Sequence, residues 1–503
     1  MPKFYITTPI YYVNDKPHIG HAYTTIAADV LARYHRLAGD EVYFLTGTDE
    51  HGSKIAEAAQ AAGKSPKEFC DENAAKFQML WDRLDISHNQ FIRTTDELHI
   101  KGVEKFLGRL KEAGAIYDGE YEGLYCQGCE RFLTEKELVN GKCPDHLTAP
   151  QLIKEKNYFF KLKEYLSKVA KLIDEGKIKI MPESRRSEVL GLIKQGLDDF
   201  SVSRESVKWG IELPFDRKQV AYVWVDALIN YISALGYDED GEKFKKFWPA
   251  DIHLMAKDII KFHALYWPAM LIAAGLPAPK VVFAHGFFTV DGQKMSKSLG
   301  NTIDPDALID SFGAEAIRYL LLSQFPFGQD GDIKAGNFSI QYNADLANGV
   351  GNFTSRVLSM AEKYLSASGG GGVVPEKDYT FSDEVAGIWR QYKEAMDRFQ
   401  IDAAIEMIKK LNGFGDGYVE RQKPWELAKT DPEELKKVIY NLLEIARHLA
   451  IMLYPIMPET AERILSFLGQ SDWKNRKLAE LKDWGGLEPG TKVEKGANLF
   501  PRI

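Results

Sequence analysis

Two histidines separated by an apolar residue and a glycine, His18-Ile19-Gly20-His21, follow a short run of aromatic and β-branched residues at 4–8. Apolar residues at helical spacing begin directly after them at Tyr23, so both imidazoles are expected at a helix N-terminus. Such an end presents unpaired N–H groups and a positive dipole, which attract phosphate, and Gly20 leaves room for a nucleotide. The pattern predicts a phosphate site, although histidines that only cap the helix are the alternative.

Two lysines lie far downstream in Lys294-Met295-Ser296-Lys297-Ser298, after the tight-turn pair Asp291-Gly292. Two ammonium groups within four residues, on a loop that contains serine and glycine, could neutralise a polyphosphate. A solvated loop is the ordinary interpretation of this spacing. Its combination with the His-x-Gly-His pattern favours polyphosphate binding.

The cysteines point to a metal site rather than to disulfides. Cys126 and Cys129 form one close pair, and Cys143 and His146 form a second pair thirteen residues later. Thiolate and imidazole are the usual ligands of tetrahedral Zn²⁺, and four protein ligands leave no open position for chemistry. The sequence thus predicts a structural zinc site, with reduced thiols as the alternative, and Cys70 as a packed helix residue.

The elements that position these residues are predicted from apolar patterning. Runs at 4–8 and 41–46 are typical of buried strands with a helix between them, and 251–255 and 281–284 repeat the pattern. Two such halves predict an α/β fold with a doubly wound parallel sheet, interrupted by an insertion that carries the cysteines. Asp49 follows the second strand, at the edge where such sheets bind ligands, although a tight turn alone would also explain it.

The pattern of apolar residues along the sequence changes past residue 340. Apolar residues keep helical spacing at 385–399 and 433–453, which predicts an all-helical C-terminal third. The glycine run Ser368–Gly372 is predicted to be a flexible connection, because glycine disfavours helix.

Composition bounds the function classes. The chain has 503 residues, 45% hydrophobic and 27% charged, which excludes a disordered or fibrous protein and gives a prior of about three domains. Its net charge of −8 excludes a globally basic nucleic-acid coat protein but not a local basic groove. The longest uncharged run, 264–279, is too short to cross a bilayer, and the N-terminus lacks a signal-peptide pattern. We expect a cytoplasmic protein without membrane contact.

Both motifs together carry a family resemblance. Pro17–His21 and Lys294–Ser298 match the HIGH and KMSKS motifs of class I aminoacyl-tRNA synthetases, in the same order and about 275 residues apart. Over essentially its full length the chain resembles the shorter bacterial methionyl-tRNA synthetases. The resemblance implies ATP-dependent activation of L-methionine to methionyl-adenylate, and transfer to the 3′-terminal adenosine of tRNA(Met), including initiator tRNA.

The resemblance also implies roles for individual residues. Catalysis and ATP binding, with Mg²⁺ accompanying ATP, fall on His18, Gly20, His21, Lys294 and Lys297. Methionine binding falls on Ile10, Tyr12, Asp49, Arg204, Trp224, Ala227, Tyr231, Ile259 and His263. These residue types suit methionine, because a carboxylate can bind its ammonium group and aromatic side chains can form walls around its polarizable thioether. Arg204 lies where the family has an arginine that pairs with the pocket aspartate. Without the motifs, the aromatic residues would be interpreted as ordinary core.

One position departs from the family. Ala256 stands where the family usually has glycine, and its methyl group is expected to crowd the backbone near the ligand. We expect a local adjustment there and not a loss of activity.

In the helical third, the family's anticodon-reading positions are matched by Asn352, Arg356, Pro424 and Trp425. A tryptophan face can stack on an unpaired base. A proline at a helix start followed by a core tryptophan is the alternative. The family also has a zinc knuckle, and all four ligand positions are filled here.

The resemblance divides the chain into four parts. A nucleotide-binding sheet is expected from 1–117 and 225–290, and a connective insertion with the zinc knuckle from 118–224. A lysine-loop and stem-contact segment is expected at 291–345, and a helical anticodon-binding domain at 346–503. We expect a monomer, because no C-terminal tRNA-binding extension follows Ile503.

Three other classes are less favoured. Class I synthetases for leucine, valine or isoleucine usually carry a much larger editing insertion than the roughly 110 residues available here. A small-molecule nucleotidylyltransferase shares the His-x-Gly-His chemistry but needs neither the lysine motif nor the zinc knuckle. A non-catalytic tRNA-binding homologue would have degraded motifs, and these are intact.

Overall fold

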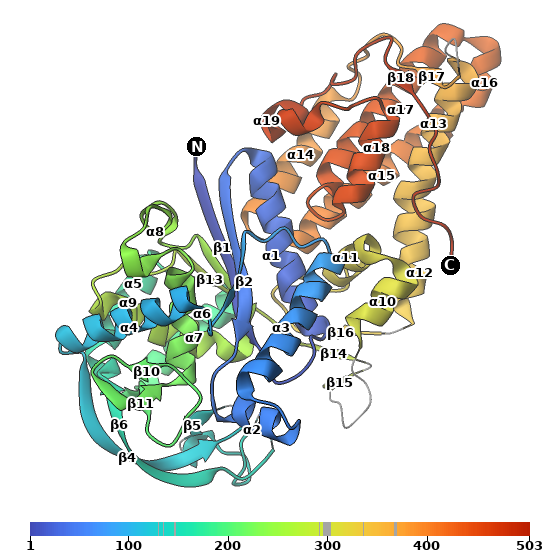
Figure 1. Ribbon diagram of the computed structural model, residues 1–503. Helices are drawn as coiled ribbons and strands as arrows, with labels where there is room; N and C mark the ends of the chain where they lie inside the picture. The colour runs from blue at the N-terminus through green and yellow to red at the C-terminus, as the bar shows by residue number, and fades with distance from the viewer. Residues whose placement is uncertain are drawn as a thin grey trace.

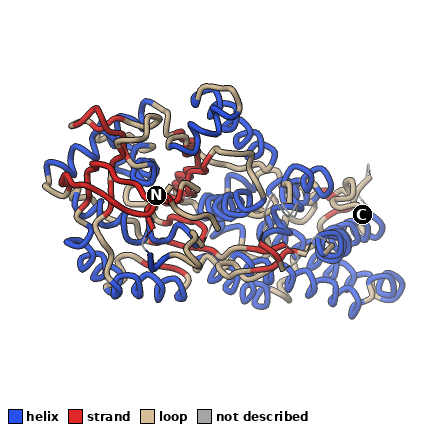
Figure 2. The backbone as a smooth tube through the Cα atoms, turned by 90° about the horizontal axis from the view of Figure 1, so that it is seen from below, coloured by secondary structure: helices blue, strands red, loops and turns tan. Residues whose placement is uncertain are grey.

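The computed structural model describes residues 1–128, 130–133, 135–144, 147–290, 292–294, 303–334, 336–366 and 370–503. Figure 1 shows an elongated molecule in which the N-terminal strands and their helices form one end and the C-terminal helices form the other. Figure 2, seen at right angles, shows the same division, with most strands gathered toward the N-terminal end.

A six-stranded parallel sheet forms the centre of the N-terminal part. Its strand order is β3-β2-β1-β12-β13-β7, and every neighbouring pair is parallel. In chain order its strands are β1 (Lys3–Tyr12), β2 (Glu41–Asp49), β3 (Gln90–Arg93), β7 (Lys179–Met181), β12 (Ile252–Ala256) and β13 (Val281–His285). The strand order reverses between β1 and β12, so the predicted doubly wound sheet is confirmed.

Both faces of this sheet are covered by helices. Side chains alternate along β1, so Phe4 and Ile6 pack into one hydrophobic core while Tyr5 packs into the other. The first core contains α1 and α3, and the second contains α4, α7 and α9. The helices of this part are α1 (Ile19–Ala38), α2 (Ser53–Ala61), α3 (Pro66–Arg83), α4 (Glu97–Glu112), α7 (Val223–Ser233), α8 (Glu242–Phe247) and α9 (Trp267–Ala273), with a 3₁₀ turn at Tyr237–Glu239, another at Lys257–Ile259 and a π-helical turn at Phe262–Tyr266.

The chain between β3 and β12 builds two small antiparallel sheets. One contains β4 (Ile116–Cys126), β5 (Arg131–Leu133), β6 (Gln151–Phe160) and β8 (Phe200–Ser201), and the other contains β9 (Ser203–Arg204), β10 (Glu212–Leu213) and β11 (Asp216–Ala221). A 3₁₀ turn (Glu135–Glu137) and helices α5 (Leu162–Asp174) and α6 (Glu183–Gln195) complete the segment. Because β7 also comes from this stretch, the predicted insertion at 118–224 contains the edge strand of the main sheet.

A smaller unit follows β13. Strands β14 (Phe288–Val290), β15 (Gln293–Lys294) and β16 (Gly331–Ile333) pair with one another, and α10 (Pro305–Phe312) and α11 (Ala314–Leu322) lie between β15 and β16 in the chain.

The C-terminal part is helical, as the sequence predicts. Its helices are α12 (Asn337–Gln341), a π-helical segment (Tyr342–Gly351), α13 (Asn352–Tyr364), α14 (Ser382–Asp397), α15 (Ile401–Gln422), α16 (Pro424–Thr430), α17 (Pro432–Leu453), α18 (Pro458–Phe467), a 3₁₀ turn (Trp473–Asn475) and α19 (Leu478–Leu481). One short pair of strands, β17 (Gly372–Val373) and β18 (Lys492–Val493), was not foreseen. It corrects part of the predicted flexible connection, because Gly372 is paired there, whereas residues 368 and 369 lie outside the described residues.

A buried arginine joins the two ends of the molecule. Arg318 of α11 is fully buried, and its Nη2 lies 2.7 Å from an oxygen of Asp29 in α1. The same guanidinium donates to the carbonyl oxygens of Leu84, Pro455 and Ile456. The central helix α1 is therefore tied through one side chain to the turn between α17 and α18.

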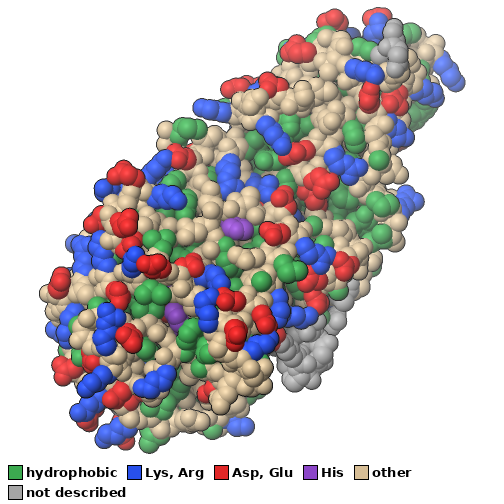
Figure 3. Space-filling view, in the orientation of Figure 1, with side chains coloured by type: hydrophobic (Ala, Val, Ile, Leu, Met, Phe, Trp, Pro, Cys, Tyr) green, Lys and Arg blue, Asp and Glu red, His purple; other side chains and the backbone are tan. Residues whose placement is uncertain are grey.

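The described residues contain no helix that is both long and apolar enough to cross a membrane. On the face seen in Figure 3, acidic and basic side chains are interspersed over both ends of the molecule.

Candidate active site

The two histidines of the first motif cap α1. The Nδ1 atom of His18 accepts from the backbone N–H of Gly20 at 3.1 Å, and Nδ1 of His21 accepts from the backbone N–H of His18 at 3.3 Å. The two rings stack with centroids 3.7 Å apart. Because Nδ1 is an acceptor in both rings, each neutral imidazole carries its proton on Nε2. That N–H is the group each ring can offer to a ligand.

The charge state of this pair follows from its surroundings. Desolvation lowers the pKa of His18, and it lowers the pKa of His21 further, with the neighbouring His18 adding to the effect. Both rings are therefore neutral donors at neutral pH. A Cβ at Gly20 would lie 2.9 Å from Cε1 of His18, so glycine is needed to leave that ring in place.

The lysine motif is only partly described. The backbone of Lys294 belongs to β15, which pairs with β14, while its side chain and residues 295–302, including Lys297, lie outside the described residues. Both flanks of this stretch can be located. Asp304, which caps α10, accepts from Nζ of Lys16 at 2.5 Å, and Lys16 lies two residues before His18. The chain that leaves the lysine motif therefore contacts the chain that enters the histidine motif.

Asp49 is the last residue of β2, at the carboxyl edge of the sheet. Only 8% of it is exposed, and its Oδ1 atom has no hydrogen-bond partner among the described residues. The backbone N–H of His51 lowers the pKa of this carboxyl group, but burial outweighs that effect. Burial, and then the negative charges of Asp226, Glu130 and Glu50, raises its pKa well above the usual range. A buried carboxylate oxygen without a partner is costly, and a cationic ligand would remove that cost.

Besides Asp49 and Arg204, the predicted methionine-binding residues come from β1, α7 and the turns that follow β12. Tyr12, at the end of β1, donates its hydroxyl to the carbonyl of His51 at 3.1 Å. On α7, Trp224 stacks on Phe262 with ring centroids 4.1 Å apart. The hydroxyl of Tyr231 and Nε2 of His263 lie 2.7 Å apart. The remaining residues that were predicted to bind methionine are Ile10 on β1, Ala227 on α7 and Ile259 in the turn after β12.

The expected partner of Arg204, another predicted methionine-binding residue, is wrong. Arg204 pairs with Glu155 and not with Asp49. Its Nε lies 2.5 Å from Oε1 of Glu155, and both side chains are buried. Its guanidinium also stacks over the ring of Tyr125, 4.3 Å from the centroid. Pairing with Asp49 is therefore absent, because neighbouring strands β6 and β9 hold a carboxylate directly beside Arg204.

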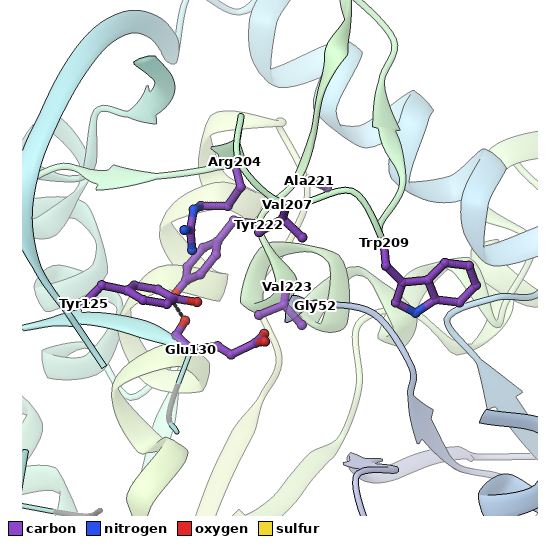
Figure 4. A pocket seen from close by; sticks show the side chains of 9 residues that line it. All are labelled: Gly52, Tyr125, Glu130, Arg204, Val207, Trp209, Ala221, Tyr222 and Val223. Atoms are coloured by element: carbon purple, nitrogen blue, oxygen red, sulfur yellow. Dashed lines mark hydrogen bonds between the residues drawn. The ribbon is translucent and has the colours of Figure 1, made fainter. Parts of the chain in front are cut away.

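Figure 4 shows the cavity in which Arg204 lies, with Tyr125, Glu130, Tyr222 and Trp209 around it. The hydroxyl of Tyr222 donates to the backbone carbonyl of Glu130 at 2.8 Å.

The departure at Ala256 is accommodated by the backbone. Its φ and ψ are −79° and 156°, an extended conformation that any residue adopts. Alanine therefore causes no backbone strain at this position.

Two of the four predicted zinc ligands lie among the residues that the structure describes. Cys126, at the end of β4, and Cys143 are almost fully buried and share a small apolar cluster with Leu133 and Leu138. Cys129 and His146 lie outside the described residues. Within the described ranges, no three His, Cys, Asp or Glu side chains form a group that could hold a metal ion. The zinc prediction therefore stays a prediction.

Cys70 lies in α3 and is buried, as predicted. Burial raises the pKa of its thiol to about 12, so this group is a packed and unreactive thiol at neutral pH.

The predicted anticodon residues come from helices that are distant in sequence. Asn352 is exposed at the start of α13, and Arg356 follows one turn later. The Arg356 guanidinium lies 5.8 Å from the ring centroid of Trp425, and it also pairs with Glu420 at 2.7 Å. Pro424 is buried at the start of α16, whereas 41% of Trp425 is exposed. An aromatic face beside a guanidinium is thus available for a stacked base.

Comparison with known proteins decides the family. A family model described as tRNA synthetases class I (M) matches residues 4–149 and 146–358, and one described as the anticodon binding domain of methionyl tRNA ligase matches 369–503. The chain belongs to the methionyl-tRNA synthetase family. The methionine–tRNA ligase of Caldanaerobacter subterraneus is 47% identical over 99% of this chain and 79% of its own length. That of Streptomyces coelicolor is 43% identical over 99% of this chain and 96% of its own.

A solved structure of a methionyl-tRNA synthetase gives the same fold. The Mycobacterium tuberculosis enzyme in complex with methionyl-adenylate has a TM-score of 0.94 and 40% sequence identity, and the match covers 100% of both chains.

Sequence reasoning missed a buried polar cluster beside this synthetase site. Asp226 is fully buried on α7 and is bonded by His51 and His99. A charged residue in the otherwise apolar run 223–229 was the available signal. A fully buried charge inside an apolar helix requires partners from elsewhere in the chain.

Asp49→Asn should make the ligand-free protein more stable at neutral pH. Folding raises the pKa of Asp49. Its contribution to the free energy of unfolding is therefore complete below the pKa of the unfolded chain and is lost as pH rises through the pKa of the folded protein. The amide side chain of asparagine does not titrate, so the variant lacks this pH-dependent loss of stability. The difference in Tm between variant and wild type should therefore widen in favour of the variant as pH increases from about 4 to about 8.

The measurement is thermal unfolding without ligand across this pH range. Asp82→Asn, on the exposed face of α3, is the matched control and should follow the wild-type curve. A Tm difference for Asp49→Asn that does not change with pH would contradict the interpretation of Asp49.

Proposed function

We propose that the chain is a methionine–tRNA ligase. It activates L-methionine with ATP to methionyl-adenylate, and it transfers the methionyl group to the 3′-terminal adenosine of tRNA(Met), including initiator tRNA. The observation that carries this function is the buried carboxylate of Asp49 at the carboxyl edge of the parallel sheet, one oxygen of which has no partner among the described residues. The proposed aromatic wall is formed by Trp224 and Tyr231 of α7. An amino acid with an ammonium group and an apolar side chain satisfies both features.

Methionine is held by complementary groups. The ammonium group binds Asp49, and its charge favours the ionised carboxylate despite burial. The thioether lies against Trp224 and Tyr231, because sulfur makes favourable contacts with aromatic rings. The bond between Tyr231 and His263 fixes the hydroxyl of the tyrosine, so the wall keeps its shape.

In the activation step, a methionine carboxylate oxygen attacks the α-phosphorus of ATP. The new O–P bond forms as the bond between the α-phosphorus and its bridging oxygen breaks, and pyrophosphate leaves. The nucleophile is already ionised, so no general base is needed. His18 and His21 donate Nε2–H to phosphate oxygens, beside the positive end of the α1 dipole.

Lys294 and Lys297 neutralise the departing pyrophosphate. Mg²⁺ enters with ATP and offsets the charge of the triphosphate. The contact between Lys16 and Asp304 supports this arrangement, because it joins the chain segments that flank the two motifs.

In the second step, the 2′-hydroxyl of the terminal adenosine attacks the methionyl carbonyl and AMP leaves. The distant helices select the tRNA. Trp425 stacks on an anticodon base, and Asn352 and Arg356 read base edges. Pro424 fixes the start of α16 and so sets the position of Trp425.

Zinc has a structural role in this proposal. Cys126 and Cys143 fit a tetrahedral thiolate site, since both thiols are buried on adjoining segments of one small cluster. With Cys129 and His146 they would hold one Zn²⁺, which would cross-link a segment with a very small apolar core.

We propose a cytoplasmic monomer. The spacing of the cysteines favours a metal site over a disulfide framework, which suits a reducing compartment.

Methionine alone should support exchange of radioactive pyrophosphate into ATP when all twenty amino acids are tested separately. Asp49 selects any α-ammonium group, so specificity must come from the aromatic wall, where one methylene is worth about 1–3 kcal/mol. A response to another amino acid that equals or exceeds the response to methionine would overturn the substrate assignment.

Trp425→Ala should lower kcat/KM for tRNA about 5- to 150-fold, which corresponds to loss of one stacked base worth about 1–3 kcal/mol. Methionine-dependent pyrophosphate exchange should stay at the wild-type rate. Tyr379→Ala removes another exposed aromatic side chain of the helical part and should leave charging unchanged. Equal losses of charging and exchange in Trp425→Ala would indicate a folding defect instead of an anticodon contact.

Metal analysis of the purified protein should find about one zinc ion per chain. Cys143→Ser should abolish zinc binding and lower the Tm, because the small cluster would lose its cross-link. Cys70→Ser changes a buried cysteine outside this cluster and should keep the zinc content. A wild-type protein purified without any metal would contradict the zinc proposal.

A further inference from the structure

A buried carboxylate next to the methionine site has no role in the mechanism above. Asp226 lies on α7, and none of its side chain is exposed. It accepts from Nδ1 of His51 at 2.7 Å and from Nε2 of His99 at 2.6 Å. Burial alone would raise the pKa of Asp226, but these two histidines lower it to about 2, so the group is an ionised acceptor at neutral pH.

The cluster locks α4 onto α7 on one side. The other ring nitrogen of His99 lies 2.8 Å from the hydroxyl of Ser233, two turns along α7 from Asp226. The helices approach closely here, because a Cβ at Gly102 would lie 2.6 Å from Cβ of Ser233. A buried charge is tolerated only where its partners are held in good geometry, so α7 provides a fixed position for Asp226.

On the other side, the cluster reaches the methionine site through His51. The carbonyl of His51 accepts from the hydroxyl of Tyr12 at 3.1 Å, and its backbone N–H acts on the carboxylate of Asp49 to lower the pKa of that group. Its ring bonds Asp226. His51 is therefore hydrogen-bonded to Tyr12 through its backbone and to the buried carboxylate of Asp226 through its side chain, and it lies two residues from Asp49 in the same turn.

The backbone of the turn that contains His51 is also held by Trp209. The backbone N–H of Gly52 donates to the carbonyl of Trp209 at 3.0 Å, and the indole N–H of Trp209 donates to the carbonyl of Glu50 at 2.5 Å. These bonds fix the backbone on both sides of His51 but do not contact its ring nitrogens. Among the described residues, Asp226 alone is hydrogen-bonded to the ring of His51, and the ring of Trp209 packs edge-on against it with centroids 5.4 Å apart.

We propose that Asp226 is a positioning residue of the methionine site and acts through His51. The same helix carries Trp224 and Ala227, so the bond from Asp226 to His51 sets the distance between the thioether wall and the carboxylate that binds the ammonium group. The inference rests on the proposed function, because it assigns Asp226 to the binding of that substrate.

Asp226→Asn tests the proposal, because it keeps the shape of the side chain and removes the charge that holds both histidines. The KM for methionine in pyrophosphate exchange should rise about tenfold. The KM for ATP should stay within about twofold, and kcat at saturating methionine within about threefold, because His18 and His21 lie on a different element. Isothermal titration with methionine alone should show the same tenfold loss.

Substitutions at His51 test whether Asp226 acts on the methionine site through this histidine. His51→Ala should reproduce the methionine defect, whereas His51→Asn, which keeps a donor near the position of Nδ1, should recover at least half of the lost affinity on a logarithmic scale. Asp226→Asn combined with His51→Ala should be no worse than either single variant. If Asp226→Asn fails to fold, the comparison of His51→Ala with His51→Asn still decides the outcome.

Ser233→Ala is the matched control, since it breaks only the outer bond of the cluster, and its KM for methionine should stay within about twofold. An unchanged methionine KM in Asp226→Asn would overturn the proposal. Equal rises in both KM values, or effects that multiply in the double variant, would also overturn it. Absence of methionine-dependent exchange in the wild-type protein would instead refute the proposed function, and this inference with it.

Discussion

The active site depends on one unsatisfied charge. Asp49 is buried, one of its oxygens has no partner among the described residues, and nearby carboxylates oppose its ionisation. In a site without ligand this arrangement costs stability, since burial disfavours the charged form. In the proposed function an ammonium group supplies the missing partner, so the free energy stored at Asp49 becomes available for binding. The proposed aromatic wall then has only to recognise an apolar side chain.

The sheet topology brings this carboxylate to the phosphate-binding end of α1. Adjacent parallel strands β1 and β2 end at the same edge, so Asp49 and the segment that leads to His18 emerge together. The strand order reverses between β1 and β12, and a crevice is expected at that point in open α/β sheets. The second half of the sheet contributes Ile259 and His263 just beyond β12. The carboxylate proposed for the amino acid and the donors proposed for the phosphate are thus both placed by short segments of chain that leave the same edge of the sheet.

Local patterns predicted the parts of this arrangement that depend on neighbouring residues. Strand runs, the helix after His21 and the edge position of Asp49 follow from periodicity and from the rules of parallel sheets. Contacts between distant segments did not follow. The pairing of Arg204 with Glu155 joins the two-residue strand β9 to β6, which belongs to a different sheet, and β7 is too short to stand out from the insertion around it. The cluster of Asp226, His51 and His99 joins three separate elements, and no local spacing encodes that contact.

The helix α1 serves both ends of the molecule. Its N-terminus holds His18 and His21, and its middle carries Asp29, which pairs with Arg33 at 2.7 Å and with Arg318 at 2.7 Å. Arg318 also bonds the carbonyls of Pro455 and Ile456 in the helical part, and Tyr34, near the end of α1, bonds Asp397 of α14. A rigid helix with buried charge pairs cannot shift at one end without straining the other. The domain that would read the anticodon is therefore fixed directly to the helix that presents the phosphate donors.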